Sequence, residues 1–583
     1  MSSRHNSATS RGSSMRQGFE HTEQDIAMDP PLTLLLRMSY QSALQEIIWS
    51  IGRMYILNLL ITSISLNQTV DFVIVEIFCE LIFSAFARAA AVGNQYSIQT
   101  FLFRRQVLAS SVYFLYVGGF LLLVTLVITI PLGVVSKHIL PPIVFDISTV
   151  QDYAYILLFS AFASGATFNF LKYSQTIEKR FDNVILLLNF IMQVLGFNIY
   201  LLLRTKTDNT IQVLGIVQAC SYTLTSAYYM SKFFSKSDEA PLKVNFANLR
   251  PFRVKLLGQV INRTLQAIFE QTFQLLFQFL IYYLFTKQQI NGRMSPSYSI
   301  VCFYIYLQCV NICNSFNTAA CEFYSNFFGS NIRINNMSRV YKMLGHGQVL
   351  NLTISVLGAL VMFLIGTEIG YMIIPRKYFD ADQYEGVKLQ IELIKFAAIS
   401  GAINTAHVCV QGLARAQHQQ SVKIISQVTN YAFAVAAIVT SLISKDSFNY
   451  SYLHLAQQIM QGIVGWMLYF MQLSHFKNIM KMQALSKPDE ANDNDEQTNI
   501  VIFKSMSQDR LEKQDTSSKS ANEIKLQPLE SGEYLGSKDH SNNQTDSSLF
   551  LKGNSGGNSG GKEKSTDPLK SAAEMLFGAS ADK

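Results

Sequence analysis

Four polar residues lie in or just before an apolar stretch long enough to cross a membrane, LQAIFEQTFQLLFQFLIYYLF at 265–285. Arg263, Gln266, Glu270 and Gln274 follow one another at spacings of three, four and four, which places them on one face of a helix. A charged side chain at the centre of a membrane helix costs about 2.5–3.5 kcal/mol on insertion scales, and such groups are typical of ion or proton paths. Glu270 is therefore predicted to exchange a proton for a positively charged substrate. A structural ion pair with Arg263 is the alternative that their spacing also permits.

Charged residues interrupt two apolar runs nearer the N-terminus. Glu46 and Arg53 are seven residues apart, about two helical turns, so they lie on roughly one face. Glu80 shares a helix face with a second glutamate four residues before it. We expect Glu46 and Glu80 to assist Glu270 in binding a proton or substrate. Arg53 and Arg263 are predicted to form ion pairs or, alternatively, a site for an anion.

Uncharged polar residues form stripes in two later runs. They are Gln308, Asn311, Asn314 and Asn317 at intervals of three, and Asn404, His407 and Gln411. For amides, hydrogen bonds that hold helices together are the favoured interpretation. Gln266, Gln274 and Asn404 are in addition predicted to shape the substrate pocket.

The composition shows which elements must position these residues. The chain has 583 residues, of which 49% are hydrophobic and 15% charged, whereas a soluble chain has about 25% charged residues. Twelve runs have the length of a membrane span. Their predicted limits are 36–62, 69–92, 107–136, 152–171, 183–203, 210–230, 256–286, 299–324, 349–374, 389–413, 424–444 and 451–473. The prediction is an all-α polytopic membrane protein.

The longest connection between runs, 232–255, divides the spans into six plus six. Weak similarities between the halves indicate a repeat, a common transporter plan with the binding site between the halves. The predicted regions are a disordered N-terminus 1–30, a first six-helix lobe 31–231, the inter-lobe loop 232–255, a second lobe 256–475 and a disordered C-terminal tail 486–583. The tail is rich in Asn, Asp, Ser and Gly, which cannot form an apolar core.

Loop charge predicts the orientation. With a cytosolic N-terminus, the cytosolic loops carry sixteen Lys and Arg residues and the opposite loops carry nine. This bias predicts that both termini are cytosolic, because positive charge is retained on that side. The membrane is predicted to be the plasma membrane or a vacuolar or other internal membrane. Loops 95–105, 172–182 and 415–423 are among those assigned to the cytosol.

Several function classes are not expected. The sequence has no phosphate-binding glycine loop and no cluster with metal-ligand spacing. We therefore expect no enzyme, no metal, no cofactor and no nucleic-acid partner, with a proton or sodium gradient as the energy source. The partners expected are the lipid bilayer and a small organic cation or xenobiotic, and a monomer is compatible with this interpretation.

Specific stretches resemble the multidrug and toxic compound extrusion (MATE) family over roughly residues 30–475. They are Gly93-Asn94 after the second run, Gly329-Ser330-Asn331 after the eighth, VCVQGLARAQHQQ at 408–420, and QAIFEQ around Glu270. Eukaryotic-type members carry a glutamate midway along the seventh span, and Glu270 resembles it. The resemblance implies proton-coupled efflux of organic cations by alternating access. The sequence departs from the family pattern at Arg53, Asn262 and Asn404.

Two alternatives remain. The wider superfamily includes flippases for lipid-linked substrates that use basic residues in a cavity, and Arg53 and Arg263 would fit that role. A non-transporting membrane scaffold whose tail recruits partners is the other alternative.

Overall fold

The structure is a computed structural model. It describes residues 30–103, 107–129, 147–178, 183–203, 210–234, 252–287, 296–333, 335–374, 381–417, 420–443 and 450–485, with a few single residues between these ranges. The chain divides into two units, 1–488 and 489–583, and all that follows concerns the first. The predicted N-terminal region before residue 30 and the predicted tail 486–583 lie outside the described residues.

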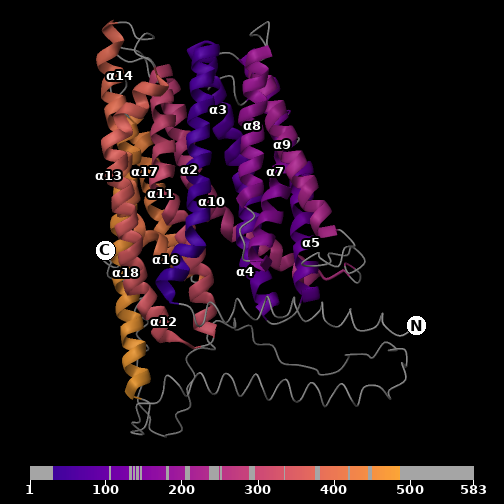
Figure 1. The fold of residues 1–583 in the computed structure, drawn as a ribbon, viewed down its shortest axis with the longest axis vertical. Helices are drawn as coiled ribbons and strands as arrows, with labels where there is room; N and C mark the ends of the chain where they lie inside the picture. The colour runs from indigo at the N-terminus through magenta and orange to yellow at the C-terminus, as the bar shows by residue number, and fades with distance from the viewer. Residues whose placement is uncertain are drawn as a thin grey trace, which may run out of the picture. The chain divides into compact units, whose positions relative to one another are not determined.

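Helices alone make up the regular structure of the described residues, and joined pieces form twelve consecutive segments (Figure 1). The first six are α2 (Pro31–Ser63); α3 (Leu66–Phe83) with the π-helical turn η1 (Ser84–Arg88) and α4 (Ala89–Phe103); α5 (Val107–Val124) with η2 (Thr125–Thr129); α7 (Ile147–Glu178); α8 (Asn183–Leu203); and α9 (Thr210–Phe234). The second six are α10 (Val254–Lys287); α11 (Pro296–Arg333); α12 (Met337–Lys342) with η4 (Met343–Gly347) and α13 (Gln348–Ile373); α14 (Ala381–Ile394), α15 (Ala397–Ile403) and α16 (Thr405–Gln417); α17 (Gln420–Ile443); and α18 (Ser451–Leu485).

Four of the described segments are long and apolar enough to cross a membrane by length and composition. Counting the pair 387–403 and 405–417, bent by 44°, as one span gives a fifth. The least apolar segments include α2 and α10, which carry the polar stripes found in the sequence. A helix that turns a polar stripe towards other protein need not be apolar all round. The apolar helices make this a multi-pass membrane protein.

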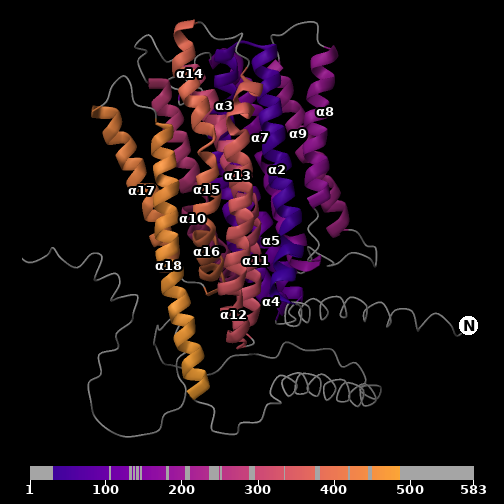
Figure 2. The same ribbon diagram turned by 60° about the vertical axis from the view of Figure 1, so that its left-hand side comes forward.

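Neighbouring helices recur in the two halves of the chain. Helix α2 packs mainly on α11 and α8, and α10 packs mainly on α4 and α17. The first helix of each half is thus seated on the second segment of the other half, and α2 is seen beside α11 in Figure 1 and in Figure 2. The pairs α7–α9 and α16–α18 are likewise equivalent. This correspondence is what two copies of one six-helix plan produce, which confirms the predicted repeat.

The apolar core is joined at one end of the bundle and divided at the other. Near the end of α2, one cluster takes buried residues from both halves, including Leu60, Phe72, Tyr282, Tyr304 and Ile373. Towards the start of α2 there are two separate clusters. One joins the first turns of α2 to α11, α12, α16 and α18, and the other joins α4, α5, α7, α9 and the first turns of α10. The core is therefore continuous at one end and forms two separate bodies at the other, each of which includes the first helix of the opposite half.

Three glycine motifs that we interpreted as span ends or turns lie inside helices. Gly93 belongs to α4, Gly329 to α11 and Gly412 to α16. A Cβ atom on Gly93 would lie 2.6 Å from the carbonyl oxygen of Arg263, and one on Gly412 would lie 2.6 Å from Cβ of Tyr324. These two glycines allow close contact between helices, and the helices continue past both of them without a turn.

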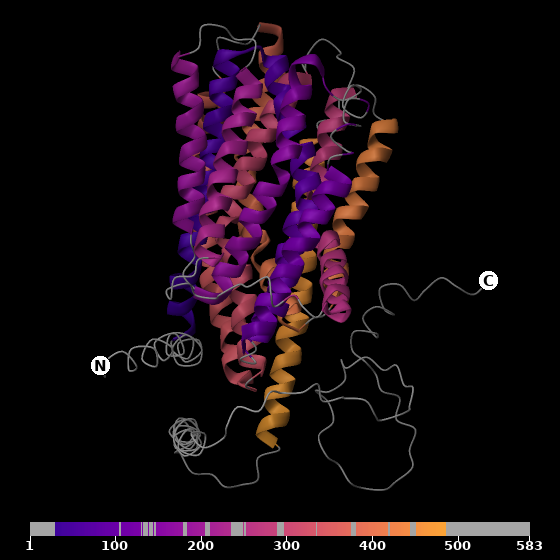
Figure 3. The ribbon, with the colours of Figure 1, turned by 90° about the vertical axis from the view of Figure 1, so that its right-hand side faces the viewer.

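Predicted loops 95–105, 172–182 and 415–423 are correspondingly shorter than expected. Helix α4 continues to Phe103, α7 to Glu178 and α16 to Gln417. Lys172 and Arg415 are therefore helical residues and not loop residues. Helix α17 diverges from the bundle towards its C-terminal end (Figure 3).

Candidate substrate cavity

A cavity of about 490 Å³ lies between the two halves, beside the joined apolar cluster. Forty residues line it, from α2, α3, η1, α4, α7, α10, α11, α16, α17 and α18 and from the bend between α15 and α16. Helix α2 contributes one stripe, whose residues recur after three or four positions and so share one face of the helix. It consists of Ser42, Gln45, Glu46, Trp49, Ser50 and Arg53.

Six of the eight predicted site residues line this cavity. They are Glu46, Glu80, Gln266, Asn404, Arg53 and Arg263. Residues 270 and 274 lie in α10 between the lining residues Ala267 and Gln278. The side chains of Glu270 and Gln274 lie outside the described residues, so the predicted pairing of Glu270 with Arg263 stays a prediction. The structure thus brings distant parts of the sequence to one place, and the roles assigned to them remain predictions.

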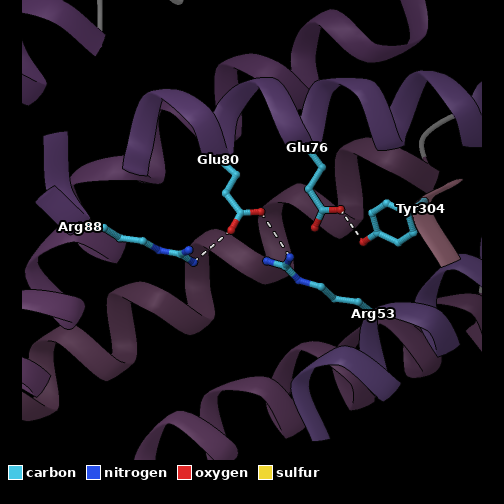
Figure 4. Close-up of polar contacts among 5 residues, drawn as sticks. All are labelled: Arg53, Glu76, Glu80, Arg88 and Tyr304. Carbon is cyan, nitrogen blue, oxygen red and sulfur yellow. Dashed lines mark hydrogen bonds and ion pairs between the residues drawn. The ribbon is translucent and has the colours of Figure 1, made fainter. Parts of the chain in front are cut away.

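The charged part of the cavity is built around Glu80 (Figure 4). One of its oxygens lies 3.3 Å from Nη1 of Arg53 on α2, and the other lies 3.1 Å from Nη2 of Arg88 in η1. One turn away, the hydroxyl of Tyr304 on α11 donates to Glu76 at 2.8 Å. A carboxylate held between two guanidinium groups acts as their counter-ion. Glu80 therefore stabilises two half-buried positive charges in this structure.

Three more interactions extend this charged part to α7 and α11. The guanidinium of Arg88 lies 5.8 Å from the ring centroid of Phe168, and the ammonium of Lys172 lies 5.5 Å from it, which are distances typical of cation–π attraction. Lys172 also forms an ion pair with Glu322 of α11. That pair crosses from one half to the other at the cavity.

On the second half, amide side chains form a hydrogen-bonded chain. Asn404 sits where α15 and α16 meet, and its amide donates to Gln458 at 2.7 Å. Gln458 donates to Gln457 at 2.7 Å, and Gln457 donates to Gln461 at 2.9 Å. The chain ends at Nε2 of His407, which lies 2.8 Å from the amide nitrogens of both Gln461 and Gln411. The amide stripes that we interpreted as helix glue therefore do hold helices together, and five of these six residues also line the cavity.

The lining as a whole is strongly polar. Fourteen of its forty residues are Asn or Gln, and only Trp49 and Phe168 are aromatic. The lining has five basic side chains, Arg53, Arg88, Lys172, Arg263 and Arg415. It has three carboxylates, Glu46, Glu80 and Glu322. Within the part of the chain that the structure describes, no group of three His, Cys, Asp or Glu residues could hold a metal ion.

Sequence reasoning missed four of these charged residues: Arg88, Lys172, Glu322 and Arg415. For Glu322, a signal was present. The amide stripe of α11 continues at Thr318, Glu322 and Ser325 with helical spacing, and all three line the cavity. The lining role of Lys172 and Arg415 could not be seen because the sequence around each of them resembles a loop.

An all-helical membrane bundle with a polar cavity between two related halves is the arrangement of transporters built from repeats. Its fold is that of MATE transporters of the MOP superfamily. A MOP superfamily transporter from Pyrococcus furiosus, described as having a binding pocket of reverse polarity, matches with a TM-score of 0.62, 12% identity, and coverage of 78% of this chain and 98% of that one. Inward-facing and outward-facing structures of a multidrug resistance MATE transporter match with TM-scores of 0.59 and 0.60. Both are 12% identical, and the match covers 77% and 78% of this chain and 99% and 98% of theirs.

No family model and no curated protein match the sequence. The resemblance drawn from the sequence is thus confirmed at the level of the fold.

Proposed function

We propose that this chain is a secondary transporter that moves a hydrophilic small molecule through the central cavity by alternating access. The observation that carries the proposal is the division of the apolar core. One cluster joins both halves at one end, while two separate clusters form at the other. One of these packs α2 with helices of the second half, and the other packs α10 with helices of the first half. Bodies packed in this way can rock about a fixed site between them, which is the movement alternating access requires.

The composition of the cavity supports a solute with a negatively charged group. Sites for drug-sized ligands are mostly apolar and aromatic, whereas this lining has fourteen carboxamides and two aromatic rings. Five basic residues against three carboxylates leave the described lining net positive, and adding Glu270 to the carboxylates would not reverse the sign. The similar Pyrococcus furiosus transporter is described as having a pocket whose reverse polarity suggests a different function. An anionic solute also fits the flippase alternative, whose substrate is a lipid-linked anion.

Proton-coupled efflux of an organic cation is the second candidate. Its support is the position of residue 270 in α10, between residues that line the cavity. An intramembrane carboxylate at that position is typical of proton or cation exchange.

Transport into vesicles separates the two candidates. The full chain is reconstituted, and uptake of a small hydrophilic anion, carboxyfluorescein, is compared with uptake of a cationic dye under an imposed pH gradient. We expect anion uptake to exceed cation uptake. Arg53→Gln should lower anion uptake about tenfold or more, because a hydrogen bond to a charged group contributes about 1.5–3 kcal/mol.

Arg253→Gln is the matched control, because Arg253 precedes α10 and lies outside the cavity lining. If only the cationic dye enters, and Glu270→Gln stops its uptake while Arg53→Gln does not, the second candidate replaces the first. If neither dye enters above the level of empty vesicles, transport of either kind by this chain is contradicted.

A further inference from the structure

We infer that the second half of the cavity holds a separate uncharged subsite, which takes a neutral, multiply hydroxylated group of the transported solute. The inference rests on the proposed function, since it concerns the same cavity. The subsite is made of amide side chains and one imidazole from α11, the α15–α16 bend, α16 and α18. Its members are Gln308, Asn404, His407, Gln411, Gln458 and Gln461.

The order of the hydrogen bonds is the first observation. From Asn404 through Gln458 and Gln457 to Gln461, each amide donates to the carbonyl oxygen of the next. A carboxamide has two N–H groups and a carbonyl oxygen with two lone pairs. Gln458, which lines the cavity, uses one N–H and one lone pair in these bonds and keeps donor and acceptor capacity in reserve. Hydrogen bonds aligned in this way also polarise one another, so the unused N–H and carbonyl groups of the chain form stronger hydrogen bonds to a solute.

Two buried carbonyl oxygens are the second, independent observation. Oδ1 of Asn404 and Oε1 of Gln308 have no hydrogen-bond partner among the described residues. The two side chains are only 5% and 3% exposed, and both residues line the cavity. Such an oxygen costs free energy unless a donor reaches it. A hydroxyl group is a suitable partner because it donates to a carbonyl and accepts from an amide N–H.

The chemistry of this wall argues against a charged occupant. Of the lining residues contributed by α16, α17, α18 and the α15–α16 bend, only Arg415 is charged, and on α11 only Glu322 is, which pairs with Lys172. The basic cluster of Arg53, Arg88 and Lys172 belongs to α2, η1 and α7 on the other half. A solute that fills both sides would present an anionic group to the basic cluster and hydroxyl groups to the amides.

Binding of three probes to the purified full-length chain tests the subsite by titration calorimetry. The probes are inorganic phosphate, glucose and glucose 6-phosphate. We expect glucose 6-phosphate to bind more tightly than phosphate. Gln461→Leu should lower the affinity for glucose 6-phosphate about three- to tenfold, since one neutral hydrogen bond to its sugar is removed. The affinity for phosphate should stay unchanged.

Gln472→Leu is the matched control, because this residue is a buried glutamine of the same helix outside the cavity lining. It should leave the affinity for all three probes unchanged. Gln458→Leu is a second variant with the same expected result as Gln461→Leu, so the test survives if one variant does not fold.

If phosphate and glucose 6-phosphate bind equally well and neither subsite variant changes their affinity, the subsite is overturned while the anionic-solute proposal stands. If both variants lose affinity for phosphate and for glucose 6-phosphate equally, the subsite is also overturned, because the amides would then bind the anionic group. If no probe binds at all but carboxyfluorescein is transported, the subsite alone fails. If neither binding nor transport is seen, the proposed function fails with it.

Discussion

The two walls of the cavity are built from different chemistry. The first half contributes five charged side chains and only two carboxamides, Gln45 and Gln95. The second half contributes twelve carboxamides and three charged side chains, Arg263, Glu322 and Arg415. The helices of the two halves are equivalent in their packing, so the repeat preserves the arrangement of the backbone while the side chains have diverged.

This difference shows what each wall can do. The charged wall holds its groups by ion pairs, as Glu80 does with Arg53 of α2 and with Arg88 further along its own segment. Removing one member leaves a charge without its partner, and that is costly in a buried place. The amide wall is held by neutral hydrogen bonds, each of which contributes only about 0.5–1.5 kcal/mol net. We therefore expect substitutions in the charged wall to destabilise the protein strongly and substitutions in the amide wall to be tolerated.

The substitution Glu80→Gln should have the largest effect on stability. It leaves two guanidinium groups without their shared counter-ion at once. Breaking a fully buried pair costs about 3–5 kcal/mol, and the loss should lie towards the lower end of that range because Arg53 and Arg88 are 17% and 33% exposed. Thermal unfolding of the purified protein should show a clear loss of stability relative to the natural chain. Glu368→Gln is the control, because Glu368 lies in α13 and is exposed outside the cavity lining. Equal melting temperatures for the two variants would contradict the counter-ion role of Glu80.

The ion pair between Lys172 and Glu322 should have an intermediate effect, because it joins the two walls. Glu322 is 24% exposed, so water lowers the cost of losing its partner. We expect Lys172→Glu alone to destabilise the protein by about 1–3 kcal/mol, since it also places two carboxylates together. The exchanged pair Lys172→Glu with Glu322→Lys should recover most of that loss. A double-mutant cycle in thermal unfolding measures the coupling, and an exchanged pair no better than the single variant would mean that the two residues act separately.

Local periodicity accounts for the part of this arrangement that the sequence predicted. Twelve apolar runs predicted the twelve helical segments, because a membrane span requires a minimum apolar length. Stripes at spacings of three and four predicted the cavity face of α2, since residues at those spacings share a face. They also marked the polar face of α11, which we interpreted as holding helices together and which lines the cavity as well. Residues such as Glu46, Arg53 and Asn404 were found in this way, although their helices are far apart in the chain.

Arg88 shows why periodicity was not enough. It follows Glu80 by eight residues, which in a regular α-helix would set the two side chains about 80° apart. The π-helical turn η1 adds a residue between them, so they differ by only about 20° and can pair. Lys172 was missed for another reason. Its partner Glu322 lies 150 residues away, and no local pattern connects two such positions.

The smallest effect is expected on the amide wall, from Gln411→Leu. Gln411 makes a neutral hydrogen bond to the imidazole of His407, which keeps its contact with Gln461 when that bond is lost. Gln411 is half-buried beside the cavity, so leucine leaves no large void, and the loss of stability should be about 0.5–1.5 kcal/mol.

Measured under the same conditions, this loss should be several times smaller than that of Glu80→Gln. Gln457→Leu is the informative companion, because Gln457 is fully buried and bonds to two other glutamines. The loss of stability caused by Gln457→Leu should lie between those of Gln411→Leu and Glu80→Gln, since two buried partners each lose a hydrogen bond. If Gln411→Leu destabilises the protein as strongly as Glu80→Gln, the amide chain is as rigid a part of the structure as the ion pairs, and the proposed contrast between the two walls is wrong.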